Sequence, residues 1–131
     1  MLTYKIHLFR HGITRANLEG KYVGLSDYPL CQEGIDALKE FVKDKDYPPV
    51  EKIYTSPLRR CRETAHILYP GYKTFDVPQL MEMDFGTYEG KTLDELQNDE
   101  SFIAWSRDSM HNAPPEGEDG MEFIRRVIKG L

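Results

Sequence analysis

The chain has 131 residues, which is enough for one domain and too short for two of ordinary size. We therefore expect residues 1–131 to form a single domain. Hydrophobic residues make up 40% of the chain and charged residues 30%, a composition that supports a soluble protein with an apolar core. No window approaches about 18 consecutive apolar residues, which argues against a transmembrane helix. The N-terminus also lacks the pattern of a signal peptide.

The two cysteines are too few for a disulfide scaffold and lack metal-ligand spacing, so we expect a cytoplasmic protein with free thiols. The net charge of −5 argues against nucleic-acid binding. The charge is uneven along the chain. Residues 1–65 hold eleven Lys/Arg and nine Asp/Glu, whereas residues 66–131 hold six and thirteen. An acidic protein of this kind can still carry a small cationic pocket, which suits a small anion better than a duplex.

The first half of the chain predicts a strand, a loop and a helix. Residues 3–9 alternate and are rich in apolar side chains, which is typical of a strand. Residues 12–30 contain many glycine, proline and polar breakers and predict a loop. Apolar residues then recur at helical spacing over 32–44. A short buried strand is expected at 50–55.

In the second half, Pro57 is well placed for the first turn of a helix that runs to about residue 68. A third strand is expected at 72–77, short helical pieces at 93–96 and 102–105, and an amphipathic helix over 121–128. Strands that alternate with helices predict an α/β fold with a mostly parallel sheet.

Arg10-His11-Gly12 follows the first predicted strand, at the edge where α/β folds place ligands. A neutral imidazole keeps one nitrogen lone pair near pH 7 and could attack phosphorus beside a fixed positive charge. The alternative is an ordinary loop histidine.

Two later segments strengthen the first interpretation. Arginines at 59, 60 and 62 follow the second strand, and guanidinium groups bind phosphate bidentately. Glu82 follows the third strand, where nearby phosphate would raise its pKa toward that of a proton donor. Taken separately, these residues could equally be a solvated basic helix face and a surface glutamate.

Six short motifs occur in order and together resemble the histidine phosphatase superfamily, whose fold is called phosphoglycerate mutase-like. They are Arg10-His11-Gly12; Thr14 with Asn17; Tyr22-x-Gly24-x-x-Asp27-x-Pro29-Leu30; Ser56-Pro57-Leu58-x-Arg60; Leu80-x-Glu82; and Gly86-x-x-Glu89-Gly90. The resemblance runs from residue 4 to about 127. It implies a three-layer α/β/α domain with a mostly parallel sheet. The stretch from Thr14 to Gly24 is most similar to α-ribazole phosphatases, although broad phosphomonoesterases share it.

The resemblance implies a role for each matching residue. His11 becomes phosphohistidine, Arg10 and Arg60 hold the phosphoryl oxygens, and Asn17 donates a further hydrogen bond. Glu82 protonates the leaving alcohol and then activates water. Tyr22 and Gly24 belong to a possible substrate loop, and no metal or other cofactor is expected.

The family also uses a second catalytic histidine, in a Ser-His-Gly setting on a strand after the helix with which this chain ends. His7, His66 and His111 do not fit that place. We therefore expect a chain that is incomplete at its C-terminus, lacks the C-terminal strand or strands, and turns over little or no substrate alone. It is either part of a longer protein of roughly 200 residues, which we favour, or completed by another chain or copy in a dimer, or a short inactive homologue.

The expected function is hydrolysis of small phosphomonoesters, with inorganic phosphate as product and with neither nucleic acid nor membrane as partner. A phosphoglycerate mutase-type phosphotransferase is a second hypothesis. Only twenty-three residues separate Gly90 from Pro114, which leaves no room for the long mutase insertion and favours the phosphatase. A non-catalytic phosphate-binding module on the same fold is the third.

Overall fold

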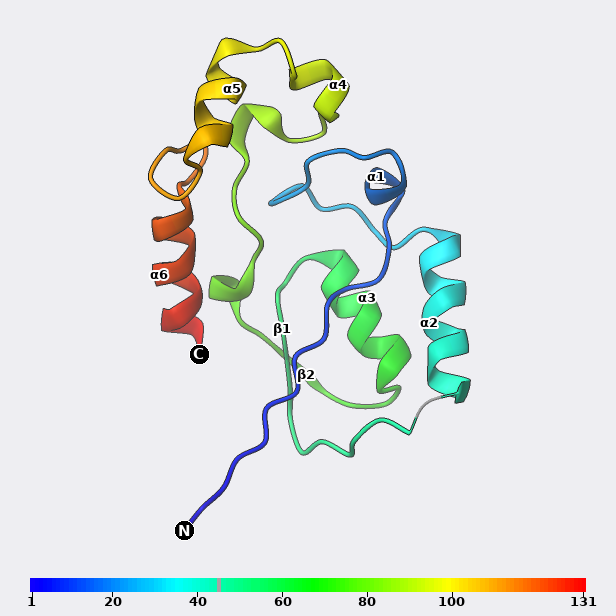
Figure 1. Cartoon of the computed structure of the whole chain (residues 1–131). Helices are drawn as coiled ribbons and strands as arrows, with labels where there is room; N and C mark the ends of the chain where they lie inside the picture. Colours follow the sequence, from blue (N-terminus) through cyan, green and yellow to red (C-terminus); the bar gives the residue numbers. More distant parts are fainter. Residues whose placement is uncertain (45) are drawn as a thin grey trace.

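The computed structural model describes residues 1–44 and 46–131, and it combines helices with a small parallel sheet (Figure 1). The chain order of its helices and strands is α1 (Arg15–Leu18), α2 (Gln32–Asp44), β1 (Ile53–Thr55), α3 (Arg59–Leu68), β2 (Thr74–Asp76), η1 (Pro78–Leu80), η2 (Gly86–Tyr88), α4 (Leu93–Leu96), α5 (Glu100–Arg107) and α6 (Gly120–Gly130).

A strand–helix–strand unit forms the centre of this arrangement. β1 pairs in parallel with β2, with Ile53 opposite Thr74 and Thr55 opposite Asp76. The ladder extends by one bond, because the N–H of Val77 donates to the carbonyl of Thr55 at 2.8 Å. α3 connects the two strands and packs against β1, and α2 packs against α3. The predicted α/β class with parallel pairing is therefore confirmed.

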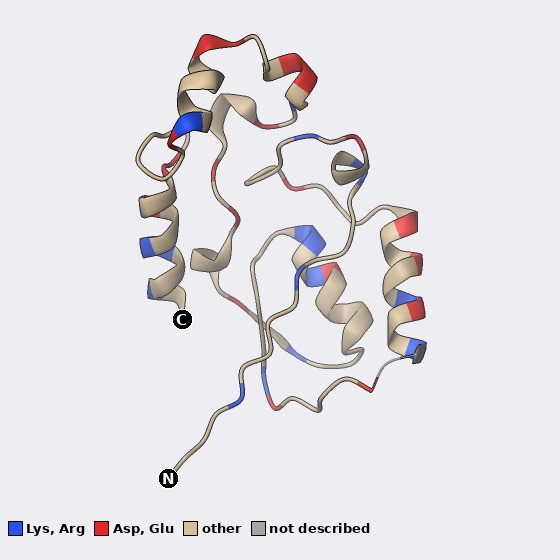
Figure 2. Ribbon diagram, in the orientation of Figure 1, with Lys and Arg blue, Asp and Glu red and all other residues tan. Residues whose placement is uncertain are grey.

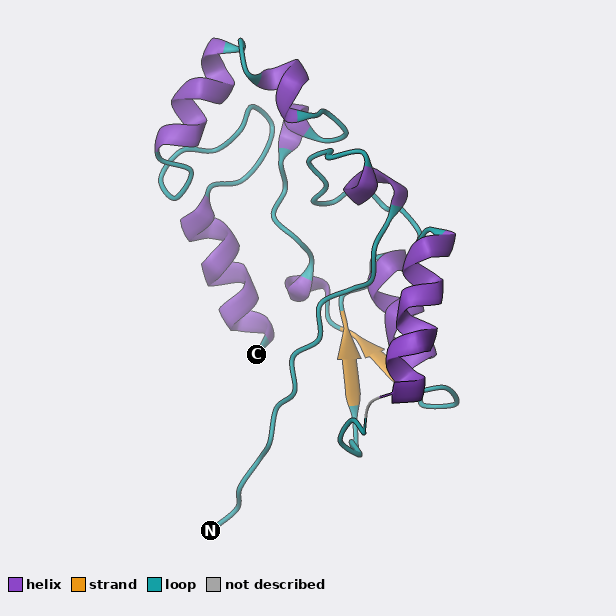
Figure 3. Ribbon diagram, turned by 45° about the vertical axis from the view of Figure 1, so that its right-hand side comes forward, coloured by secondary structure: helices purple, strands orange, loops and turns teal. Residues whose placement is uncertain are grey.

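The predicted strand over residues 3–9 is wrong. Residues 1–10 are exposed extended chain outside the sheet. From an N-terminus that projects away from the body of the molecule, they run past β1 toward the site (Figure 3). Within the described ranges, no backbone hydrogen bond joins residues 1–9 to another segment. A strand requires a hydrogen-bonded neighbour, whereas alternation only assigns side chains to faces. Apolar side chains in this segment, such as Ile6 at 78% exposure, consequently face solvent.

The other predicted elements are confirmed with adjusted ends. The helix over 32–44 is α2, the strands at 50–55 and 72–77 shorten to three residues each, and the helical pieces at 93–96 and 102–105 correspond to α4 and α5. Pro57 lies before α3 and not in its first turn, because Leu58 occupies the N-cap. The predicted loop over 12–30 contains one helical turn, α1, which Thr14 caps.

The main apolar cluster lies outside the β1–α3–β2 unit. Met83, Tyr88, Leu96, Phe102 and Trp105 are buried together. The rings meet edge-on or tilted, with the centroids of Phe102 and Trp105 5.7 Å apart. This cluster fixes α4 and α5 against the segment that leads away from η1.

Trp105→Ala should lower the free energy of unfolding by about 3–5 kcal/mol, because it empties the centre of this cluster. Ile103→Ala is the matched control on the same helix, where the side chain is 38% exposed, and it should cost roughly 1 kcal/mol or less. Urea unfolding followed by circular dichroism measures both. Equal losses in the two variants would contradict this account of the core.

Candidate active site

Four of the predicted site residues come together around one cavity. Arg10, His11, Arg60 and Glu82 all line a cavity of about 170 Å³. Arg10 and His11 also line a larger neighbouring cavity of about 530 Å³, to which Asn17 and Tyr22 contribute. The two cavities therefore share Arg10 and His11. Gly24 lines neither, and its part in the site is indirect.

His11 is held so that one ring nitrogen is free. Its Nδ1 lies 2.6 Å from the carbonyl oxygen of Gly12. A carbonyl can only accept, so Nδ1 carries the hydrogen and Nε2 keeps its lone pair. The N–H of Gly12 donates to Thr64 Oγ1 at 2.9 Å, and that hydroxyl donates to the carbonyl of Arg60 at 2.6 Å. The turn that carries His11 is thus fixed directly to α3.

The surroundings of His11 favour its neutral form. Burial lowers the pKa of its imidazole from the ordinary 6.5, and the positive charges of Arg60 and Arg10 lower it further. The bond to Gly12 and the charge of Glu82 act in the opposite direction without reversing the shift. A lowered pKa means that more of the imidazole is unprotonated at any pH below neutrality.

Arg60 is almost completely enclosed, at 1% exposure. Its Nη1 donates to the carbonyl of Ser26 at 2.8 Å and its Nη2 donates to that of Gly24 at 2.7 Å. Its Nε has no partner among the described residues. The two carbonyls fix the plane of the guanidinium, and an oxyanion in the adjoining cavity would satisfy hydrogens that the protein leaves unpaired.

Asn17 has its acceptor occupied and its donor available. The side chains of Thr14 and Asn17 form a reciprocal cap on α1, in which Asn17 Oδ1 accepts from the N–H of Thr14 at 2.9 Å. This assigns the amide oxygen to the backbone and leaves Nδ2 as the group that can donate to a ligand in the larger cavity.

Glu82 is exposed, and its Oε1 accepts from the N–H of Met83 at 2.8 Å. Its backbone follows η1, whereas His11 and Arg60 come from the segments before α1 and at the start of α3. Three separate parts of the chain therefore meet at this cavity. Figure 2 shows the corresponding charge pattern: Lys and Arg gather at the N-terminal end of α3, α4 carries Asp and Glu, and α2 carries charges of both signs.

Glu89 is a residue whose structural part the sequence reasoning missed. Its carboxylate accepts from the N–H groups of Gly24 and Leu25, both at 2.9 Å, and from Ser26 Oγ at 2.8 Å. It therefore fixes the loop whose carbonyls hold Arg60. The loop passes so closely that a Cβ on Gly24 would lie 1.7 Å from the carbonyl oxygen of Met83. The only signal for Glu89 in the sequence is its place in Gly86-x-x-Glu89-Gly90.

The remaining histidines lie apart from the site. His7, His66 and His111 are exposed, and none of them lines either cavity. His111 pairs with Asp108. No cluster of three or more potential metal ligands occurs within residues 1–44 and 46–131. Cys31 and Cys61 are free thiols. In the described part of the chain, no helix is both long and apolar enough to cross a bilayer.

The fold and this site define an α/β protein with a histidine and two arginines around one small cavity, an arrangement that can receive a small oxyanion. The sequence profile of the histidine phosphatase superfamily (branch 1) matches residues 6–131. The chain belongs to this superfamily, as the ordered motifs indicate.

Similar proteins include both phosphatases and mutases. The adenosylcobalamin/alpha-ribazole phosphatase of Salmonella typhimurium is 35% identical over 130 residues, which cover 94% of this chain and 63% of that protein. A 2,3-bisphosphoglycerate-dependent phosphoglycerate mutase of Bifidobacterium longum is 33% identical, over 95% of this chain and 54% of the mutase. The structure of the alpha-ribazole phosphatase from Shigella flexneri superposes with a TM-score of 0.82 at 32% identity, covering 91% of this chain and 61% of that one. The chain thus spans less than two thirds of the length of these relatives.

Titration of the His11 imidazole by NMR should give a midpoint below 6.5, because burial and two arginines disfavour its charged form. Arg10→Gln should move the midpoint upward by removing one of the positive charges. Arg15→Gln is the matched control, since Arg15 is exposed and pairs with Glu33. A wild-type midpoint at or above 6.5 would show that the imidazole is not enclosed as described.

Glu89→Gln should destabilise the fold by about 1–3 kcal/mol, because an amide keeps only one acceptor oxygen and its NH2 group then faces the N–H of Gly24, which contacts both carboxylate oxygens. Glu95→Gln, on the exposed side of α4, should leave stability nearly unchanged. Chemical unfolding compares the two. The loop would be anchored by other contacts if Glu89→Gln unfolded at the same urea concentration as wild type.

Proposed function

We propose that this chain provides the nucleophile, two phosphate-binding arginines and the general acid of a metal-independent phosphomonoesterase. The main observation behind this proposal is that Nε2 of His11 is free in a cavity that Arg10, Arg60 and Glu82 also line. Support comes from membership of the superfamily and from the phosphatases among its relatives.

The reaction proceeds in two balanced steps. His11 Nε2 attacks phosphorus, the N–P bond forms as the P–O bond to the alcohol breaks, and Glu82 gives its proton to the leaving oxygen. Water then attacks phosphorus, a new P–O bond forms as the N–P bond breaks, Glu82 takes up the proton of the water, and inorganic phosphate leaves with His11 Nε2 restored. Arg10, Arg60 and Asn17 bind the phosphoryl oxygens, so that catalysis consists mainly of positioning and charge stabilisation.

The larger cavity is the proposed place for the leaving group. It adjoins His11 and is walled by Tyr22 and Leu93. The ring of Tyr22 is fixed, because it meets Phe85, Phe102 and Trp105 edge-on. A substrate that fills both cavities would be a small phosphomonoester, with its phosphate in the smaller cavity and its organic group in the larger one.

A mutase is the second candidate, and the mutase relatives favour it. The two functions differ only in what accepts the phosphoryl group from His11, which is water for a phosphatase and a substrate hydroxyl for a mutase. The short connection between Gly90 and Pro114 favours the phosphatase. Exchange between 2- and 3-phosphoglycerate, followed by mass spectrometry, would show the mutase.

Incubation with p-nitrophenyl phosphate, followed by alkaline denaturation and mass spectrometry, should find a phosphoryl group on His11. His11→Ala should abolish the label, because His7, His66 and His111 line neither of the two cavities. His66→Ala is the matched control on α3 and should retain it. Trapping the intermediate tests the nucleophile even where turnover is slow. A label that survives in His11→Ala, or no label in wild type, would refute the proposed mechanism.

A further inference from the structure

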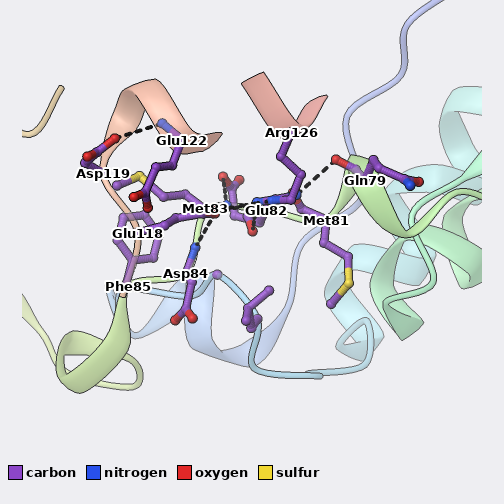
Figure 4. Close-up of polar contacts among 12 residues, drawn as sticks. Gln79, Met81, Glu82, Met83, Asp84, Phe85, Glu118, Asp119, Glu122 and Arg126 are labelled. Atoms are coloured by element: carbon purple, nitrogen blue, oxygen red, sulfur yellow. Dashed lines mark hydrogen bonds and ion pairs between the residues drawn. The ribbon is translucent and has the colours of Figure 1, made fainter. Parts of the chain in front are cut away.

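Arg126 of α6 is bound to the segment that carries Glu82, far from it in sequence. Its Nη1 donates to the carbonyls of Gln79 at 2.9 Å and Met81 at 2.8 Å, and its Nη2 donates to that of Glu82 at 3.2 Å. Figure 4 shows the side chain reaching from the helix across this segment. One guanidinium therefore satisfies three carbonyls that no regular secondary structure pairs.

Glu118 binds both Arg126 and the backbone that follows Glu82. It forms an ion pair with Arg126, whose Nε also donates to Glu118 Oε2 at 3.3 Å. The same carboxylate accepts from the N–H of Asp84 at 3.0 Å, and the N–H of Glu118 donates to the carbonyl of Asp84 at 3.1 Å. The backbone is thus held both before and after Glu82 (Figure 4).

The Glu82 side chain needs this support because it has little of its own. It is exposed, so packing does not select its rotamer, and its only side-chain hydrogen bond in the described chain is to the N–H of the next residue, Met83. The direction of the carboxylate therefore depends on the orientation of the peptide planes on either side of Glu82. Arg126 sets those planes through the carbonyls of Met81 and Glu82.

We propose that Arg126, together with Glu118, is a positioning residue for the acid–base carboxylate of Glu82. This inference rests on the proposed function and assigns Arg126 no contact with substrate. A catalytic acid must lie within hydrogen-bond reach of the leaving oxygen, and misplacement by about 1 Å is costly. The planar fork of arginine can bind several carbonyls at once, whereas a lysine ammonium in the same place is a point charge on a flexible stem.

Arg126→Lys keeps the charge and removes the fork, which makes it the central variant. Arg125→Lys is the matched control, since Arg125 is the preceding residue and is exposed. Glu118→Gln is a second variant, which removes the ion pair but retains an acceptor for the N–H of Asp84. Unfolding midpoints establish that each variant is folded before any other comparison.

The first measurement follows the amide proton of Met83 by NMR as Glu82 is titrated. In wild type and Arg125→Lys this proton should shift strongly, since it donates to the titrating carboxylate. In folded Arg126→Lys and Glu118→Gln the amplitude should fall by about half or more, because the carboxylate no longer stays beside it. An unchanged amplitude in both variants would overturn the inference, and this measurement requires no enzymatic activity.

The second measurement separates acid positioning from general loosening of the site. The p-nitrophenolate anion is a weak base and leaves without being protonated. Phenolate is a stronger base, so its departure depends more on a proton from the acid. Arg126→Lys should therefore slow phosphohistidine formation from phenyl phosphate about tenfold more than from p-nitrophenyl phosphate, within the range that general acids contribute. Equal slowing of both would overturn the inference. Absence of phosphohistidine in wild type would instead refute the proposed function, and the amide titration would still decide whether Arg126 fixes Glu82.

Discussion

The site depends on how the buried charge of Arg60 is accommodated. A guanidinium at 1% exposure is tolerated only where its hydrogens find acceptors. Here the acceptors are the carbonyls of Gly24 and Ser26, and they stay in place because Glu89 binds the N–H groups and the hydroxyl of the same loop. Glu89 thus binds the hydrogen-bond donors of the loop, and Arg60 binds its carbonyl acceptors. Neither interaction alone would order both sides of it.

His11 is held by the residues that follow it. The segment before His11 has no partner strand among the described residues, yet the imidazole is fixed through Gly12, Thr64 and the start of α3. Gly12 also lies against α2, since a Cβ there would meet Leu38 at 2.8 Å. The geometry at His11 therefore depends on the turn after it and on α2 and α3, and not on residues 1–10.

Much of this arrangement could be predicted from the sequence, and the failures have a common cause. The helices follow from apolar spacing, and the roles proposed for His11 and Arg60 follow from ordered motifs. The strand at 3–9 could not be excluded by pattern, because pairing is a property of neighbours and not of the segment. Glu89 and Arg126 were missed because side-chain bonds to a distant backbone leave no periodic signal.

The same kind of anchorage prepares a site built from irregular segments before any ligand enters it. The loop at 24–26, the turn at 11–12 and the segment at 79–84 lack regular secondary structure except for the short turn η1, so each would lose conformational freedom on binding a ligand. Side chains from distant parts of the chain already hold all three: Glu89 binds the loop, the hydroxyl of Thr64 binds the turn, and Arg126 binds the segment. A phosphate that enters the smaller cavity therefore meets donors already in place, and its binding energy is not spent on ordering them.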